Sequence, residues 1–313
     1  MILITGGSGY LGARLAKFLT KVRSEKVIIA LRKDSSALID VIPNCEFKTF
    51  DLTDQSSLDD LLTGVSHVIH LVALNAQQSF DDPNLAERVN VEGASNVVKA
   101  SVKNRVKRII YFSTAHVYSS PLKGLIDESI APQNDHPYAM THLKAEQEIN
   151  KLLKGTITKH TIFRLSNAIG APLIKETNCW MLVVNDIVKQ LIEKDEIVFT
   201  SGRKTERDYI AISQICEVVN QVISDENERY DGMFNLGSGT SLSLESIAEL
   251  VSKRAKKILS KDITITFPKD SIESDLKLNF SIDKITNTGI KITPDLTKEI
   301  DHLLIKSKQW FNP

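Results

Sequence analysis

A chain of 313 residues is long enough to bury a sizeable core, as one large domain or as two modest ones. Its 39 basic and 39 acidic residues balance, which argues against a general nucleic-acid binder with a basic surplus. Three distant cysteines do not form a disulfide framework or a metal site, no apolar run reaches the ~18 residues of a membrane span, and no signal peptide is recognisable at the start. We therefore expect a cytoplasmic protein without metal, nucleic-acid or membrane partners.

The first half of the chain alternates short apolar runs with segments of helical periodicity. Strands are expected at residues 2–4, 26–31, 46–50, 67–71, 108–113 and 161–165. Helices are expected at residues 10–21, 56–62, 83–103 and 136–153. Repeated β-α-β units with nearly continuous apolar strands predict an α/β fold, in which a doubly wound parallel sheet is covered by helices on both faces.

The pattern becomes looser after residue 170. A helix over 180–192, short strands and a lysine-rich final third indicate a smaller and less regular lobe. We therefore predict a larger domain at 1–170 and a smaller lobe at 171–313. The chain is expected to return to the first domain around 207–235.

A glycine-rich turn joins the first expected strand to the first expected helix. It reads Thr5-Gly6-Gly7-Ser8-Gly9-Tyr10-Leu11-Gly12, with glycines at the spacing GxxGxxG. Gly6 permits the tight turn, Gly9 lets the backbone approach a pyrophosphate, and Gly12 lets the helix pack closely on the strand. The free N–H groups at the helix start favour the phosphates. The alternative is a chance glycine turn before an ordinary helix.

Two strand ends add to this expected cofactor site. Asp51 follows the third strand, where its carboxylate can accept a hydrogen bond from the adenine amino group, or where it can simply cap the next helix. The second strand ends in Arg32 and Lys33, at a place where an NAD site usually has an acid for the ribose hydroxyls. Two cations can pair with a 2′-phosphate, so the sequence favours NADP over NAD. A solvated basic strand end is the alternative.

Further motifs follow in order: HLVA at 70–73, FSTAHVY at 112–118, YAMTHLKAE at 138–146, FRLSN at 163–167 and RDY at 207–209. Together with the glycine turn they resemble the extended short-chain dehydrogenase/reductases, a family of nucleotide-sugar epimerases, dehydratases and ketoreductases. The resemblance covers nearly the whole chain and is specific for fold and cofactor rather than for substrate. It implies that 1–170 form an NAD(P)-binding Rossmann domain and that 171–313 form the substrate-binding lobe. It implies these cofactor contacts: Gly6, Gly9, Tyr10, Leu11, Gly12, Arg32, Asp51, Leu52, Leu71, Ala73, Ser113, Tyr138 and His142.

The resemblance also implies the catalytic residues. Tyr138 is the catalytic tyrosine, which exchanges a proton with the sugar while hydride passes to or from the nicotinamide, and Thr114 orients the same oxygen. The family pattern Tyr-x-x-x-Lys is broken here, because His142 stands where a lysine normally holds the nicotinamide ribose and lowers the tyrosine pKa. Lys144 lies about 240° around the helix from Tyr138 and cannot replace that lysine. A working variant, a slow enzyme and a binder without turnover all remain open.

The substrate side narrows the chemistry. The 4,6-dehydratases of this family follow the threonine with Asp-Glu, whereas this chain has Ala115 and His116, so dehydration is not expected. Arg207 resembles the family arginine that reaches the substrate diphosphate, for which a guanidinium fork is well suited. Asn167 and, on a looser alignment, Asn178 resemble residues near the sugar phosphates and the nucleotide. A surface ion pair, a turn and a helix cap are their respective alternatives.

The implied function is an NAD(P)-dependent epimerase or ketoreductase of a nucleotide-activated sugar, in the synthesis of cell-surface polysaccharide precursors. An NADPH-dependent ketoreductase of a non-nucleotide substrate, or a non-catalytic NAD(P)-binding protein, are the alternatives. The resemblance also implies a homodimer, in which the helices at 83–103 and 136–153 pack across a two-fold axis as a four-helix bundle.

Overall fold

A parallel sheet of seven strands forms the centre of the computed structural model, which describes residues 1–32, 36–269 and 277–312. The strands are β1 (Ile2–Thr5), β2 (Val27–Leu31), β3 (Cys45–Thr49), β4 (His67–His70), β5 (Arg108–Thr114), β7 (Lys159–Leu165) and β11 (Gly232–Leu236). Their order is β11-β7-β5-β4-β1-β2-β3, and every pairing is parallel. The order reverses beside β1, as in doubly wound dinucleotide-binding folds, so the predicted fold class is confirmed.

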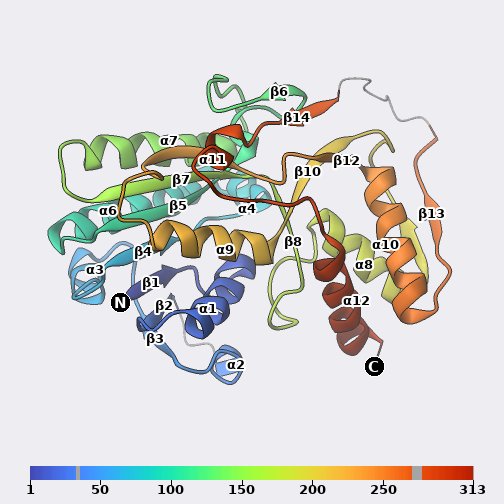
Figure 1. Ribbon diagram of the computed structural model, residues 1–313, viewed down its shortest axis with the longest axis horizontal. Coiled ribbons are helices and arrows are strands. Elements are labelled where there is room, and N and C mark those ends of the chain that lie inside the picture. The colour runs from blue at the N-terminus through green and yellow to red at the C-terminus, as the bar shows by residue number, and fades with distance from the viewer. Residues whose placement is uncertain (33–35, 270–276, 313) are drawn as a thin grey trace.

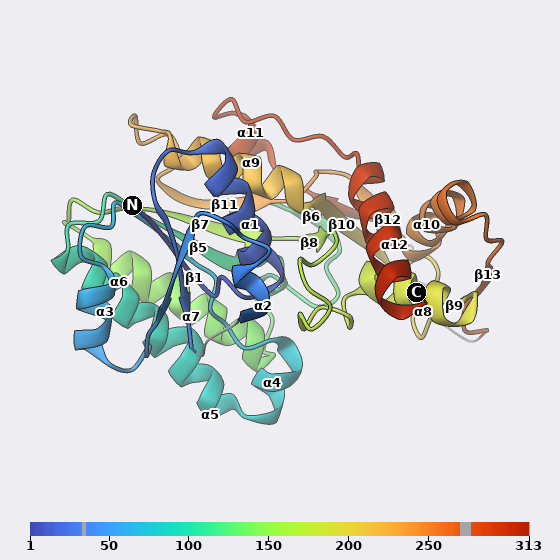
Figure 2. The same cartoon turned by 90° about the horizontal axis from the view of Figure 1, so that it is seen from below.

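Helices cover both faces of this sheet, because its strands are apolar on both sides. One face packs against α1 (Tyr10–Val22) and α9 (Ile212–Ile223). The other packs against α3 (Gln55–Leu61), α6 (Gly93–Lys103) and α7 (Pro137–Leu153). Figure 2 shows the sheet between these two helical layers.

The segment expected as one helix over 83–103 is divided. It consists of α5 (Pro83–Ala86), a π-helical segment η1 (Glu87–Glu92) and α6, and a separate α4 (Ala76–Asp81) precedes it. Asn90 in the π segment is fully buried; its side chain accepts a hydrogen bond from the Leu74 backbone N–H at 2.8 Å and donates to Thr141 of α7 at 3.0 Å. A π turn changes the direction of side chains without ending the helix, and the buried Asn90 lies within this one.

Most of the remaining elements gather at the carboxyl ends of the strands (Figure 1). A second sheet contains β8 (Asn167–Ile169), β10 (Glu206–Ala211) and β12 (Ser241–Ser243). Beside it lie α8 (Val183–Lys194), α10 (Leu244–Leu259) and α12 (Thr297–Phe311), with the strand pair β9 (Glu196–Val198) and β13 (Thr264–Thr266). Shorter elements are α2 (Ser36–Ile39), η2 (Ala115–Val117), β6 (Gly124–Ile126), β14 (Leu278–Phe280) and α11 (Asp283–Thr286).

Contacts from α1 hold this lobe against the glycine turn. The Tyr10 hydroxyl donates to the Gly170 carbonyl at 2.6 Å, and Arg14 forms a largely buried ion pair with Glu299 of α12 at 2.6 Å. The helix that begins at the glycine turn therefore also fixes the position of the smaller lobe.

Candidate active site

The glycine turn has the geometry of a dinucleotide cradle. Gly6 has φ +73°, and a Cβ there would lie 2.9 Å from the Leu71 carbonyl carbon. A Cβ on Gly12 would lie 2.4 Å from the Gly6 carbonyl oxygen, so only glycine allows this approach of helix to strand. Gly9 precedes the 13-residue helix α1, and no side chain caps the helix start. The N–H groups there are free for a pyrophosphate, so these residues fit the cofactor that the motif predicts.

Other predicted cofactor residues lie around this turn. Leu71 is half-buried directly beneath Gly6, and its N–H donates to the Thr5 carbonyl at 3.1 Å. Ala73 is exposed just beyond it, and Arg32 is exposed at the end of β2. Lys33, the second predicted cation, lies outside the described residues.

Asp51 and Leu52 follow β3. One Asp51 carboxylate oxygen accepts hydrogen bonds from the Thr53 N–H at 2.8 Å and the Thr53 hydroxyl at 2.7 Å. These bonds lower the pKa of Asp51 and leave its other oxygen for a ligand, while Asp54 caps the next helix. The alternative that Asp51 only caps the next helix is therefore wrong, because Asp54 is that cap, and the adenine contact of Asp51 stays a prediction.

A cavity of about 350 Å³ opens at the carboxyl ends of β5 and β7, between the large sheet and the β8–β10 pair. Seven of the predicted site residues line it: Tyr10, Leu11, Ser113, Thr114, Tyr138, Asn167 and Arg207. They come from five elements of the chain, α1, β5, α7, β8 and β10, which meet at one edge of the large sheet, as expected for ligand sites in open α/β sheets.

Tyr138 begins α7 with its hydroxyl toward Thr114. Burial raises the pKa of Tyr138, and a side-chain hydrogen bond with Thr114 partly opposes that rise. At neutral pH the phenol is therefore protonated and placed to donate a proton. Thr114 also accepts the His116 backbone N–H at 3.2 Å, which fixes the turn after β5.

His142 lies one helical turn beyond Tyr138 and is 2% exposed. Its Nδ1 is 2.9 Å from the Tyr111 hydroxyl, and burial, together with His70, lowers its pKa to about 4. The ring is therefore neutral at pH 7 and supplies no positive charge to Tyr138. It does not line the cavity, so its predicted contact with a ribose hydroxyl stays a prediction.

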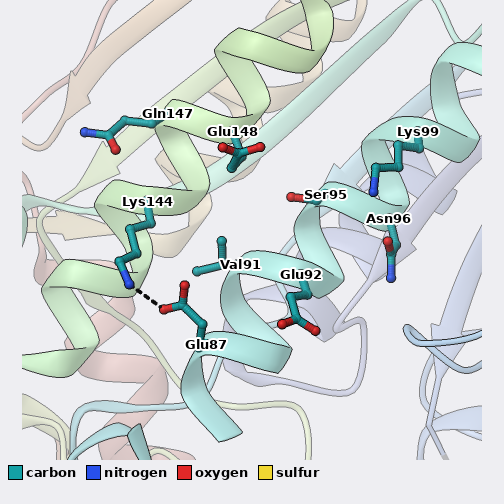
Figure 3. Close-up of a pocket in the computed structure, with 9 residues that line it drawn as sticks. All are labelled: Glu87, Val91, Glu92, Ser95, Asn96, Lys99, Lys144, Gln147 and Glu148. Atoms are coloured by element: carbon teal, nitrogen blue, oxygen red, sulfur yellow. Dashed lines mark hydrogen bonds and ion pairs between the residues drawn. The ribbon is translucent and has the colours of Figure 1, made fainter. Parts of the chain in front are cut away.

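Lys144 lies on the opposite, outer face of α7. Its Nζ is 2.9 Å from a Glu87 carboxylate oxygen, and both side chains point to the surface (Figure 3). The prediction that Lys144 cannot replace the missing lysine is thus confirmed.

Arg207 and Asn167 come from neighbouring strands of the second sheet. The buried carboxylate of Asp208 fixes this region by accepting hydrogen bonds from Ser166 Oγ at 2.6 Å and from the Ser238 N–H at 2.9 Å, and burial raises its pKa. Asn167 Nδ2 donates to the Asp208 carbonyl at 2.8 Å. Asn178 is exposed and is not part of the cavity lining, so the structure does not bring it to the other predicted residues.

Three polar residues of the cavity were not predicted from the sequence: His116, Ser166 and Tyr209. His116 follows Thr114 by two residues, and burial, together with Arg207 and His136, lowers its pKa. Tyr209 follows Arg207 by two residues, and alternation along a strand places both on one face. That alternation was the available signal for Tyr209. For His116, no signal in the sequence pointed to a site residue: the position showed only that the acid expected of a dehydratase is absent there.

Three features are absent from the described residues. None of the described residues that line the cavity is acidic. No group of three or more His, Cys, Asp or Glu residues in the described part could hold a metal ion. No helix in these ranges is long and apolar enough to cross a membrane.

A glycine-cradled Rossmann sheet with a Tyr–Thr pair at its carboxyl edge defines a nicotinamide-dinucleotide oxidoreductase of the short-chain type. The sequence profile of the NAD dependent epimerase/dehydratase family matches residues 2–237. The chain belongs to this family, and the family prediction is confirmed.

Known relatives support the same assignment. The UDP-glucose 4-epimerase of Halalkalibacterium halodurans is 29% identical over 269 residues, which cover 80% of this chain and 78% of the relative. The GDP-6-deoxy-D-talose 4-dehydrogenase of Aggregatibacter actinomycetemcomitans is 27% identical over 258 residues, with the same coverage.

Solved structures share the fold. The UDP-N-acetylglucosamine 4-epimerase from Methanobrevibacter ruminantium, in complex with UDP-N-acetylmuramic acid, superposes with a TM-score of 0.83 at 20% identity and covers 99% of this chain and 97% of that one. A monomeric L-threonine 3-dehydrogenase from a metagenome also gives 0.83, at 18% identity, with full coverage of both chains. Enzymes with different substrates thus share this architecture.

Proposed function

We propose that the protein is an NAD(P)-dependent epimerase or ketoreductase of a nucleotide-activated sugar, in the synthesis of cell-surface polysaccharide precursors in the cytoplasm. One observation carries the proposal: Tyr138, Thr114 and Arg207 line a single cavity beside the glycine cradle. A proton donor and a cation suited to a diphosphate thus line the same cavity.

The bound nicotinamide would accept or supply the hydride. The chain's own residues would handle the proton and the substrate. Tyr138 would exchange a proton with the reacting sugar oxygen, while Thr114 holds that oxygen by a hydrogen bond. Arg207 would form charge-assisted hydrogen bonds with the diphosphate, and Asn167 would contact it from the adjacent strand. Binding the two ends of the substrate fixes the reacting carbon with respect to the cofactor.

Dehydration is not part of the proposal. Elimination needs an acid and a base at the sugar in addition to the tyrosine, and the positions after Thr114 hold Ala115 and His116. Ala115 is buried and has no titratable group. Since no described cavity residue is acidic, epimerisation and ketone reduction fit the lining better.

A ketoreductase with a small non-nucleotide substrate is the second candidate. The similar fold of a threonine dehydrogenase favours it, because that enzyme's named substrate carries no nucleotide. In that case Arg207 would not bind a diphosphate. A binder of the cofactor without turnover is the third candidate, and His142 is the feature that supports it.

Thermal shift measurements with UDP-, dTDP-, GDP- and CDP-sugars, each with either cofactor, test the proposal. A ligand that binds the native state raises the melting temperature by mass action. Arg207→Ala should remove the shift, since the loss of a charge-assisted contact costs ~2–5 kcal/mol. Arg203→Ala is the matched control, because Arg203 is an exposed arginine of the same lobe that pairs with Glu245 at 3.3 Å. Equal shifts in wild type and Arg207→Ala would favour the non-nucleotide ketoreductase.

A further inference from the structure

A row of buried polar side chains crosses the sheet beneath the active site. Thr5, His70 and Tyr111 are direct partners in the registers of β1, β4 and β5, and each is at most 2% exposed. Side chains in one register row point to the same face of a sheet. Tyr111 belongs to the core cluster formed with α7, so this row lies under the helix that carries Tyr138 and His142.

Contacts run along this row to the catalytic tyrosine. Thr5 Oγ1 is 2.6 Å from His70 Nδ1, and the His70 ring stacks on the Tyr111 ring with centroids 5.9 Å apart. The Tyr111 hydroxyl is 2.9 Å from His142 Nδ1. The His142 ring in turn meets the Tyr138 ring edge-on, with centroids 4.6 Å apart.

The hydrogen-bond inventory decides which His142 nitrogen carries the proton. Among the described residues, the Tyr111 hydroxyl has no partner other than His142 Nδ1, and His142 Nε2 has none. If Nδ1 were protonated, the Tyr111 proton would be left without an acceptor and Nε2 without a donor. If Tyr111 donates to Nδ1, only the Nε2–H group is unpaired. The second arrangement leaves fewer buried polar groups unsatisfied and is therefore the more stable.

We propose that Tyr111 is a positioning residue that holds His142 in its Nε2–H form, so that this donor serves an acceptor bound beside Tyr138 in place of the missing lysine. The acceptor chemistry that fits is a ribose hydroxyl of the nicotinamide cofactor, and in this respect the inference rests on the proposed function. An unpaired buried donor is destabilising until such an acceptor arrives. Tyr111 is buried and touches the cofactor only through His142, so it acts on binding indirectly.

The tautomer can be measured without cofactor or substrate. Long-range ¹H–¹⁵N correlation spectra of uniformly ¹⁵N-labelled wild type should show His142 as the Nε2–H tautomer, with the signals assigned by their loss in His142→Gln. In Tyr111→Phe the Nδ1 partner is gone, so we expect a mixture of tautomers or the Nδ1–H form. An Nδ1–H tautomer in the wild type would overturn the proposal, whether or not Tyr111→Phe folds.

Cofactor affinity gives the second readout. Tyr111→Phe should weaken cofactor binding about five- to tenfold, the value of one hydrogen bond. Tyr118→Phe is the matched control: this tyrosine is 1% exposed and donates to Asn235 Oδ1 at 2.7 Å, so it also loses a buried hydroxyl but does not contact His142. Equal affinities of the Tyr111→Phe and Tyr118→Phe proteins would overturn the positioning role. If no nucleotide-sugar binds but the tautomer is as expected, the proposed function fails and this inference stands.

Discussion

The imidazole of His142 lies edge-on to the phenol of Tyr138, at a centroid separation of 4.6 Å and an interplanar angle of 77°. In this contact a neutral ring replaces the ammonium that the family pattern places one turn after the tyrosine. Burial raises the pKa of Tyr138, and the depressed pKa of His142 means that no charge on the imidazole opposes that rise. Proton transfer therefore depends on a tyrosine that releases its proton less readily than in a lysine-bearing relative.

Tyr138→Phe should abolish turnover and leave cofactor affinity nearly unchanged. The substitution removes only the hydroxyl, so the ring keeps its edge contact with His142 and the glycine cradle is untouched. Turnover by product analysis and cofactor binding by fluorescence titration measure the two effects separately. Full turnover in the variant would show that another acid does the work, and His116 in the same cavity would be the next residue to replace.

Arg32→Ala should reduce affinity for NADP(H) more than for NAD(H). Arg32 is exposed at the end of β2, where a guanidinium can reach a 2′-phosphate. A lost charge-assisted contact at an exposed site corresponds to ~1 kcal/mol or more. Titrations of wild type and variant with both cofactors test this. Tighter NAD(H) binding by the wild type, unchanged in the variant, would reject the NADP preference.

A homodimer through α6 and α7 is expected, and its interface would be polar. The outer groove between η1, α6 and α7 carries Glu92, Lys99 and Glu148 beside the Lys144–Glu87 pair (Figure 3). In a two-fold interface the acidic side chains of one copy can face the basic side chains of the other, so association should weaken as salt screens these attractions. Light scattering at micromolar concentration should give twice the chain mass of 34.9 kDa. Lys144→Glu should lower that mass, whereas Lys308→Glu, at an exposed position of α12, should not. A monomeric wild type at low salt would contradict the prediction.

The sequence predicted six of the seven strands of the large sheet, because these strands are short apolar runs separated by segments of helical periodicity. The edge strand β11 was not predicted, and the helix expected over 83–103 is divided. The switch-point rule predicted that Thr114 and Tyr138 share one cleft, and the family resemblance placed Arg207 on the substrate side. All three line the cavity, but Arg207 comes from β10 of the second sheet. The smaller lobe was less predictable, because β8 and β10 are distant in the sequence, and their pairing places Tyr209 beside Asn167 at the cavity.

Two other features depend on register and could not be predicted from local patterns. The contact between Tyr111 and His142 joins residues 31 positions apart, and its existence depends on how α7 lies across β5. The π segment η1 likewise follows from where Asn90 can find partners, which a search for helical periodicity does not detect.

Stability should fall with acidification below pH 6.5 because of two buried imidazoles. Burial lowers the pKa of His70 and of His142 to about 4, while an unfolded histidine has a pKa of about 6.5. The unfolded state therefore binds more protons between these values, so the stabilisation is complete above pH 6.5 and is lost as pH falls toward 4. Each ring accounts for roughly 3 kcal/mol at most. Urea unfolding at pH 7.5 and 5 measures the loss, and His142→Gln should reduce it; equal losses in both proteins would contradict the assignment to His142.

His142→Lys should move the pH optimum of turnover downward. In the wild type the raised pKa of Tyr138 keeps the phenol protonated over most of the neutral range, so oxidation of a sugar hydroxyl, which needs the phenolate as base, should speed up as pH rises. A lysine one turn away places a cation beside the phenol and stabilises its ionised form, so the rising limb of the profile should shift to lower pH. Because the lysine side chain is long and flexible, its ammonium group can reach the cleft even though the imidazole that it replaces is buried. The pH dependence of kcat/KM is measured in wild type, His142→Lys and His142→Gln. The glutamine variant shows the effect of losing the imidazole, and the lysine variant shows the added effect of a cation at this position. If the lysine and glutamine variants keep the same profile as the wild type, Tyr138 is not the group whose ionisation limits turnover.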